Sequence, residues 1–457
     1  MRVVLSSLSA FAISAAFALA AGQAVAQTPA PYAATLAGHA VMPALSLIPA
    51  PDDAPADLKV SGKFTTGTRI DEPGTREGLS KLRPTGISIP FEGQPVQGHS
   101  GIKHMPDGTF WILTDNGFGA KATSPDTMLH LNHYRVDFKT GTFERLATVF
   151  LHDPDRKVPF RITHEGTDKR YLTGSDFDPE SFQFAQDALW VGDEFGPYLI
   201  KANLQGKVLA VFDTLVDGKA VRSPDHPNVV APGKPGDALK VQVTRSKGFE
   251  GMAAAKDGSK LYALLEGPLW QPGSGKLEQV SGKHYLRVLE FDTKKEEWTG
   301  RHWKYPLEDA GHAIGDFNMI DETTGLIIER DNGEGTADKA CAAGRQKTMD
   351  CFPDLPTFKR VYKVELNDEN AGSVVRKIGY IDLMNIADPD KLARKPLNGK
   401  GALEFPFFTI ENVDVVGDRH IVVGNDNNLP FSSSREPNRA DDNELVLLEV
   451  GDFLKAR

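Results

Sequence analysis

Short apolar runs recur along the chain, and polar residues frame them at matched spacing. In five stretches a leading residue is followed seven positions later by a turn residue, then by an apolar run, and then by an acid or amide. Two apolar segments joined by a tight turn predict a β-hairpin, and repetition in one register predicts a repeat architecture. The leading residues and their turn partners are Ser100 and Asp107, Glu180 and Asp187, Glu250 and Asp257, Asn318 and Gly325, and Glu411 and Asp418.

Further strand-like runs follow most hairpins, whereas no long stretch has the periodicity of an amphipathic helix. Four strands per repeat, arranged radially, make a β-propeller blade. We therefore predict an all-β fold, a single closed β-propeller of four-stranded antiparallel blades. Five blades are favoured, and six stay open because a degenerate blade could lie within 27–98. The additional runs are at 133–138, 143–150, 198–202, 207–212, 285–291, 360–366 and 376–381.

The fifth repeat ends one strand short, after the run at 444–450. A strand from 41–50 or 58–64 is expected to complete it, because closure removes exposed sheet edges. The predicted domains are an N-terminal segment at 27–98, which contributes this strand, and the propeller at 99–457.

Residues 1–26 have the pattern of a secretory signal peptide, with Arg2, an apolar stretch, and Ala24-Val25-Ala26 before the cleavage point. No other stretch is apolar enough to cross a bilayer. We expect a periplasmic or secreted monomer. The net charge is −10 and there is no basic run, so nucleic acid and anionic membrane surfaces are poor partners.

The only two cysteines, Cys341 and Cys351, lie in one polar loop. In an oxidising compartment this spacing predicts a local disulfide, with two free thiols as the alternative.

The five leading residues form a predicted inner ring, because the first strand of each blade lines the channel of a propeller. Its carboxylates would repel one another unless a cation lay among them. All five side chains offer hard oxygen ligands, which suit Ca²⁺ better than Zn²⁺. The ring therefore predicts a Ca²⁺ site, and a channel of water and polar side chains is the alternative. Its members are Ser100, Glu180, Glu250, Asn318 and Glu411.

A second, outer ring of acids and amides follows the second strand of each repeat and opens on the same face. Its acids are candidates for metal-assisted hydrolysis, and ordinary turn chemistry is the alternative. The ring consists of Asp115, Glu194, Glu266, Asp331 and Asn425, and the predicted catalytic residues are Asp115, Asp193, Glu194, Glu266 and Asp331.

Cations and amides near this face are candidates for binding a phosphorylated small molecule. Each cation taken alone could equally be a solvated surface charge. The predicted substrate-binding residues are Arg330, Arg435, Asn116 and Asn332, and Lys247 and Arg439 are further cations of interest.

The series SGI…TDNG, DPES…GDEFG, GFEGMA…LLEG, FNMI…ERDNG and ENVDVV…GNDNN resembles the phytase-like family, described as "esterase-like activity of phytase". The resemblance covers about residues 95–450 and implies ester or phosphoester hydrolysis. The inner-ring order is also similar to that of the calcium-activated nucleotidases, five-bladed propellers with Ca²⁺ in the channel. Asn318 stands where that pattern has serine.

Three functions follow from these observations. The first is a Ca²⁺-dependent phosphoester hydrolase in which an outer-ring carboxylate is the general base. The second is a binding or scaffold propeller that Ca²⁺ only stabilises. The third is a lactonase or other carboxylic-ester hydrolase that uses the same metal.

Overall fold

The computed structural model describes residues 28–271, 274–342 and 350–457. The signal peptide expected at 1–26 lies outside these ranges. Nearly all of the regular structure is β-strand, and the one α-helix among the described residues is α1 (Gly451–Lys455). The expected all-β fold is confirmed. Within the same ranges, no helix has the length and apolar character needed to span a membrane.

Each predicted repeat forms a group of strands that are hydrogen-bonded antiparallel in chain order. The first two groups are β8 (His99–His104), β9 (Phe110–Thr114), β10 (His130–Asp137) and β11 (Thr142–Phe150), then β12 (Pro179–Ala185), β13 (Ala188–Asp193), β14 (Tyr198–Ala202) and β15 (Val208–Asp213). The next two are β18 (Phe249–Ala254), β19 (Lys260–Leu265), β21 (Lys283–Asp292) and β22 (Glu297–Pro306), then β23 (Ala313–Met319), β24 (Thr324–Arg330), β25 (Lys359–Glu365) and β26 (Arg376–Ala387). The last contains β28 (Ile410–Val416), β29 (His420–Asn425) and β30 (Asn443–Glu449).

The fourth strand of the last group is β1 (Ala30–Met42), which pairs antiparallel with β30. It also pairs in parallel with β26, so the last two groups form one nine-stranded sheet with β27 (Ala402–Leu403) at its side. This strand begins well before 41–50 or 58–64, the segments proposed from the sequence. Its sequence is rich in alanine and has few of the β-branched and aromatic residues that mark a strand.

The remaining elements are short. The hairpin β4–β5 is tied to the rest of the molecule by Arg83, whose Nη2 donates to Glu334 Oε1 at 2.9 Å and to Ser433 Oγ at 2.9 Å. Cys341 and Cys351, in the connection between β24 and β25, form a disulfide. The short elements are β2 (Leu47–Ile48), η1 (Ala56–Lys59), β3 (Val60–Ser61), β4 (Arg76–Ser80), β5 (Arg83–Ile89), β6 (Phe91–Glu92), β7 (Gln94–Pro95), β16 (Leu215–Val216), β17 (Lys219–Ala220), β20 (Gln279–Val280) and η2 (Ala337–Lys339).

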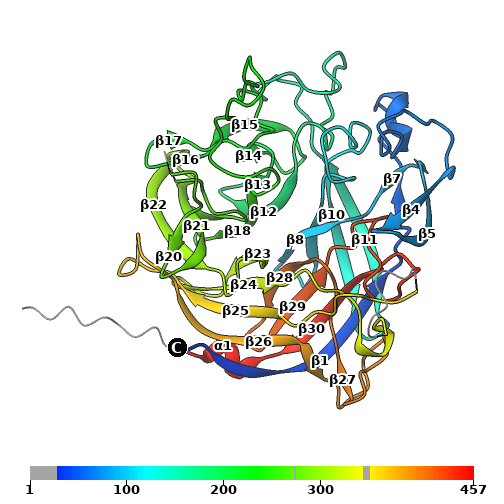
Figure 1. The fold of residues 1–457 in the computed structure, drawn as a ribbon, viewed down its shortest axis with the longest axis vertical. Coiled ribbons are helices and arrows are strands. Elements are labelled where there is room, and N and C mark those ends of the chain that lie inside the picture. Colours follow the sequence, from blue (N-terminus) through cyan, green and yellow to red (C-terminus); the bar gives the residue numbers. More distant parts are fainter. Residues whose placement is uncertain (1–27, 272–273, 343–349) are drawn as a thin grey trace, which may run out of the picture.

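The first strands of the groups lie toward the middle of the molecule, and the outer strands β15, β22 and β26 lie at its periphery (Figure 1). Neighbouring first strands contact one another in the order β8, β12, β18, β23 and β28, and β28 contacts β8 again. The polar residues of the inner strands are thereby brought around one axis.

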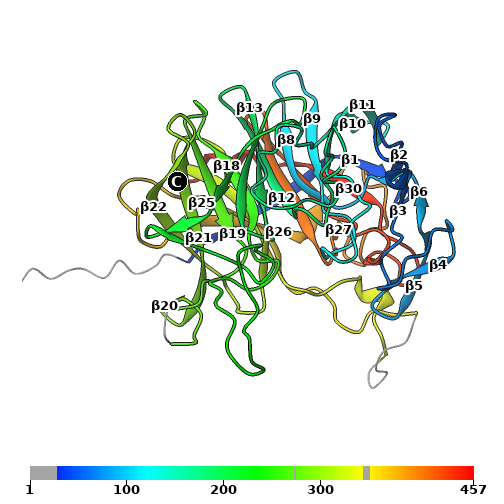
Figure 2. The same ribbon diagram turned by 90° about the horizontal axis from the view of Figure 1, so that it is seen from above.

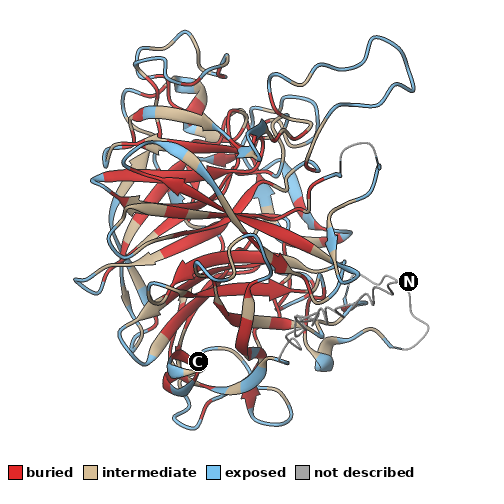
Figure 3. Ribbon diagram, turned by 90° about the vertical axis from the view of Figure 1, so that its left-hand side faces the viewer, coloured by how far each residue is buried: buried red, intermediate tan, exposed pale blue. Residues whose placement is uncertain are grey.

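Apolar side chains fill the spaces between neighbouring groups. Between the first two groups, for example, Leu131 and Leu113 belong to the same cluster as Phe182 and Val191. Buried residues are accordingly concentrated in the sheets, whereas the long outer loops are largely exposed (Figure 3). Because each group is covered on both faces, its strands are rigid supports for the loops at their ends.

Candidate active site

A shift in the pairing register near the start of each inner strand positions the side chains of the site. In β12, Pro179 pairs with Asp193 and Ser181 with Gly192, so the intervening Glu180 has no partner. The same shift in register occurs at Glu250 in β18 and at Glu411 in β28. A β-bulge of this kind re-aims a side chain. It turns these three carboxylates toward one cavity.

The cavity has a volume of about 320 Å³ and lies where the second strands end. The connections that carry β20 and η2 follow the second strands β19 and β24, and the loop with β20 projects from the sheets (Figure 2). Eight carboxyl groups line it, and Lys247 and Arg330 are the cations among its described lining residues. The acids are Asp115, Asp178, Glu180, Glu194, Glu250, Glu266, Glu411 and Asp426.

Ser100, the first residue of the expected inner ring, adjoins this cluster. It lies at the register shift of β8, and its Oγ donates a hydrogen bond of 3.2 Å to Glu411 Oε2. The hydroxyl therefore orients one of the inner carboxylates.

Asn318 does not reach the cavity, because the fourth repeat is displaced by three residues from the predicted register. Ile314 pairs with Glu329 and Phe317 with Ile327, so the irregular position in β23 is at Gly315 and Asp316. A Cβ on Gly315 would lie 2.2 Å from the backbone oxygen of Ile410, and packing therefore excludes a side chain there.

The amide of Asn318 instead links the inner strands. Its Nδ2 donates to the backbone oxygens of Ile102 at 3.2 Å and Val413 at 2.9 Å. Its Oδ1 accepts hydrogen bonds from Lys103 Nζ at 2.9 Å and Gln183 Nε2 at 2.8 Å. These bonds occupy the oxygen that was expected to bind a metal.

The outer-ring residues of the first three repeats line the cavity, and in the last two repeats the lining residue is shifted by one position. Asp115, Glu194 and Glu266 line the cavity. In the fourth and fifth repeats the lining residues are Arg330 and Asp426, each directly before or after the residue expected, Asp331 or Asn425. The shift follows from the pairing just before each bulge. Glu329 pairs with Ile314 and is followed by Arg330, one residue before the position expected. Asn425 pairs with Ile410 and is followed by Asp426, one residue after it.

Asp193 and Asp331 hold backbone turns and are absent from the described lining of the cavity. Asp193 accepts from the amides of Asp178 at 2.8 Å and Gly196 at 2.7 Å. Asp331 accepts from the amides of Thr357 at 2.6 Å and Phe358 at 2.9 Å. Both carboxylates therefore stabilise backbone turns, which is the alternative to catalysis given above for the outer ring.

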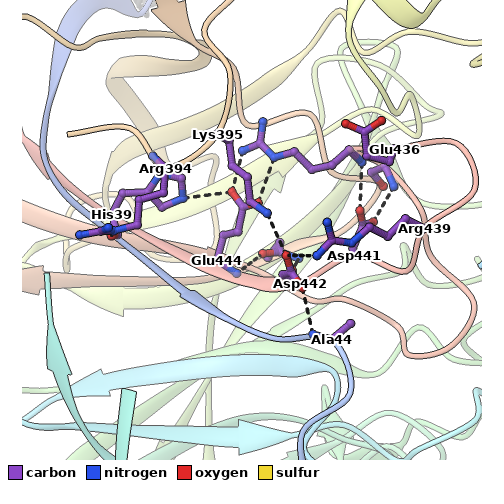
Figure 4. A network of polar contacts seen from close by, with 12 residues as sticks. His39, Ala44, Arg394, Lys395, Glu436, Arg439, Asp441, Asp442 and Glu444 are labelled. Carbon is purple, nitrogen blue, oxygen red and sulfur yellow. Dashed lines mark hydrogen bonds and ion pairs between the residues drawn. The ribbon is translucent and has the colours of Figure 1, made fainter. Parts of the chain in front are cut away.

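Of the predicted substrate-binding residues, Asn116 and Arg330 reach the cavity. Asn332 is exposed and accepts a hydrogen bond of 2.9 Å from Arg330 Nη1. Arg435 belongs to a different polar network, in which its Nη2 donates to Glu444 Oε2 at 2.6 Å. That network also contains Arg439, which lies with Glu444 and Asp442 in Figure 4, so neither arginine contributes to the acidic cavity.

Two further acids complete the cluster: Asp178, which the sequence pattern did not identify, and Asp426, which stands beside the outer-ring residue Asn425 in the sequence. Asp178 lies two residues before Glu180 and accepts a hydrogen bond from Asn116 Nδ2. Asp426 follows Asn425 at the end of β29. The Asp-Pro-Glu-Ser motif contains the signal for Asp178, because this acid stands only two positions from Glu180.

Burial and mutual repulsion dominate the electrostatics of the cavity. Burial, followed by the charges of Asp115 and Asp178, raises the pKa of Glu180 well above its ordinary value. Burial, followed by Glu411 and Glu266, raises the pKa of Glu250 in the same way. Such a cluster favours either protons or a bound cation.

Two sets of three acids have oxygens within 4.8 Å of one another: Asp115, Asp178 and Glu180, and Glu194, Glu250 and Glu266. Glu194 is only 4% exposed, and its Oε1 has no hydrogen-bond partner. Hard oxygen donors in an irregular arrangement fit Ca²⁺, which accepts six to eight oxygens. The residues present are therefore compatible with the predicted metal.

The family model described as "Phytase-like: Esterase-like activity of phytase" matches residues 94–429, a range that includes every residue lining the cavity. The chain belongs to this phytase-like family. An uncharacterized secreted protein of Arthroderma benhamiae is 31% identical over 124 residues, which are 25% of this chain and 24% of that protein. The chain thus matches about a quarter of the relative's length.

Solved structures with partial similarity include the periplasmic gluconolactonase PpgL of Pseudomonas aeruginosa, at 13% identity and a TM-score of 0.31, covering 86% of this chain and 98% of that one. The GH43 endo-arabinanase from Bacillus licheniformis has 10% identity and a TM-score of 0.35, covering 78% of this chain and 94% of that one. Similarity at this level says nothing of what this phytase-like chain acts on.

Proposed function

We propose that this phytase-like protein is an exported, calcium-dependent hydrolase of phosphoesters. The observation that carries the proposal is the convergence of eight carboxyl groups, Lys247 and Arg330 on one cavity, all within the range that matches the family. The description of the family as esterase-like supports hydrolysis.

We further propose that the five groups of strands form a single closed five-bladed propeller. The cyclic contacts of the inner strands and the pairing of β1 with β30 support this arrangement. In such a ring the bulged residues of successive blades face a common axis, and scattered positions in the chain become one site.

The inner carboxylates Glu180, Glu250 and Glu411 would hold Ca²⁺, and Asp178 lies beside the first of them. When bound, the ion would offset their negative charge and polarise a phosphoryl oxygen. Ser100 keeps Glu411 in place through its hydrogen bond. A general base would come from the outer-ring acids that reach the cavity, Asp115, Glu194 and Glu266.

Arg330 is suited to bind the anionic group of the substrate. Its guanidinium lies over the ring of Phe408 at 5.4 Å, and Nη1 is fixed by Asn332. The Nε is buried without a hydrogen-bond partner. A planar guanidinium matches the geometry of phosphate oxygens, and Phe408 is the single large apolar residue among the described lining residues. These features favour a phosphoester over an apolar carboxylic ester.

Export is supported by the N-terminal sequence pattern and by the disulfide between Cys341 and Cys351, since disulfides persist in oxidising compartments. The relative from Arthroderma benhamiae is described as secreted.

The proposal is tested by measuring hydrolysis of phosphomonoesters, phosphodiesters, nucleotides and lactones, each with Ca²⁺ and with a chelator. We expect phosphoester turnover that chelation abolishes and that Glu250→Gln lowers by about 10²-fold or more, because an inner carboxylate is lost. Glu297→Gln, on the exposed outer strand β22, is the matched control and should retain full turnover. Lactone hydrolysis alone, or turnover that is insensitive to chelation, would contradict the proposal.

A further inference from the structure

The two sets of acids in the cavity differ in whether the chain supplies them with a cation. Lys247 Nζ forms an ion pair with Glu266 Oε2, in the set that also contains Glu194 and Glu250. Arg330 Nη2 lies 3.7 Å from Glu411 Oε1, outside both sets. Asp115, Asp178 and Glu180 have no ion pair with lysine or arginine among the described residues.

The backbone holds Lys247 beside this set. The amide of Gly267 donates to the Lys247 oxygen at 3.2 Å, and the amide of Glu266 donates to the Gly248 oxygen at 2.8 Å. A Cβ on Gly267 would lie 2.6 Å from the Lys247 Cβ, so glycine permits this close approach. The lysine therefore reaches the acids from a fixed base, and its side chain remains 39% exposed at the rim.

One ammonium cannot satisfy three carboxylates. Lys247 pairs with Glu266, while Glu194 Oε1 remains without a hydrogen-bond partner inside the same set. A buried polar atom without a partner is costly. The unpaired oxygen therefore indicates a position at which a further ligand binds, and three converging carboxylates select a cation.

We propose that Glu194, Glu250 and Glu266 form a second divalent-cation position, and that Lys247 is a competing counter-cation which leaves Glu266 when the ion binds. The inference deepens the proposed function and rests on it for the choice of Ca²⁺. Glu250 is common to both positions. With Glu194 and Glu266 engaged as ligands, Asp115 is the outer-ring acid that remains for the role of general base.

The experiment is calcium titration of the mature protein by isothermal titration calorimetry, together with a count of bound calcium by elemental analysis. Wild type should bind two ions. Lys247→Met removes the competing charge and keeps an unbranched stem, so the weaker site should tighten by about tenfold, which corresponds to about 1.4 kcal/mol. Lys247→Arg retains the charge and should titrate like wild type. Glu194→Gln should lose the weaker site and retain the other.

A wild type with one site that Lys247→Met leaves unchanged would overturn the inference, as would two sites in Glu194→Gln. Thermal melts of each variant confirm that it is folded. Because titration needs no substrate, the expected binding pattern without phosphoester turnover would refute the proposed function alone. Calcium-dependent turnover with a Glu194→Gln variant that retains both sites would refute the second cation position alone.

Discussion

Adjacent acids at the end of one strand have different roles in this protein. Asp193 is completely buried and its carboxylate accepts hydrogen bonds from the Asp178 and Gly196 amides. Glu194, the next residue, lines the cavity and has an unpaired oxygen. Successive side chains on an extended backbone point in opposite directions, so one acid maintains the turn and the other faces the site.

The same contrast between an acid that faces the cavity and one that holds a turn predicts different phenotypes for Asp115→Asn and Asp193→Ala. Asp115→Asn should remain folded and lose about 10²–10⁴-fold in turnover, because it removes the proposed general base. Asp193→Ala should unfold more readily, by about 3 kcal/mol, because it leaves buried backbone amides without acceptors. Chemical denaturation and turnover measured on both variants distinguish the two effects. Wild-type turnover in Asp115→Asn would remove Asp115 from the chemistry.

At the scale of the element, one bulge per inner strand decides which side chains enter the site. Glu180, Glu250 and Glu411 occupy this position in three strands. Gly315 lies at it in β23, against the backbone of β28. The fourth repeat therefore gives the inner ring no carboxylate, and Arg330 supplies a positive charge from the end of the next strand.

Gly315→Ala should destabilise the protein by about 1–3 kcal/mol, the usual cost of overpacking. The new methyl group would meet the Ile410 oxygen at 2.2 Å and the Glu411 Cα at 3.1 Å. Because Glu411 is displaced, calcium affinity should fall as well. The control is Gly399→Ala, where no atom lies within 4 Å of an added Cβ. Equal denaturation midpoints for the two variants would show that β28 can move away from the methyl group without loss of stability.

At the scale of the whole molecule, β1 connects the two ends of the described chain. It lies between β26 and β30, and His39 Nε2 lies 3.1 Å from Glu444 Oε2 in the completely buried interior. Leu36 and Ala40 are also buried. Without this strand, two sheet edges would be exposed, and unpaired edges favour aggregation.

Deleting residues 30–42 should therefore abolish cooperative thermal unfolding and cause association, as measured by circular dichroism and size-exclusion chromatography. Shortening the exposed segment 231–239 is the control, and it should leave the melting temperature close to that of wild type. A monomeric, cooperatively folded deletion variant would show that the last group is stable with three strands.

The strands of the repeats could be predicted from the sequence, because alternation and turn residues are local properties that a single segment contains. The seven-residue spacing also identified Glu180, Glu250 and Glu411, which meet in one cavity. Asp115, Glu194 and Glu266 were found in the same way. In these repeats the local pattern and the register of the sheet agree.

Only the tertiary structure decided the remaining parts, because each depends on a contact between segments distant in the chain. Gly315, and not Asn318, lies at the bulge of β23, where a side chain would meet the oxygen of Ile410, nearly one hundred positions away in sequence. The last group is completed by β1, whose partners β26 and β30 come from the other end of the chain. Lys247 is paired with Glu266 because the backbone at Gly267 packs against it. The spacing of residues along the chain does not predict these contacts, because they form only when strands that are distant in sequence pack together.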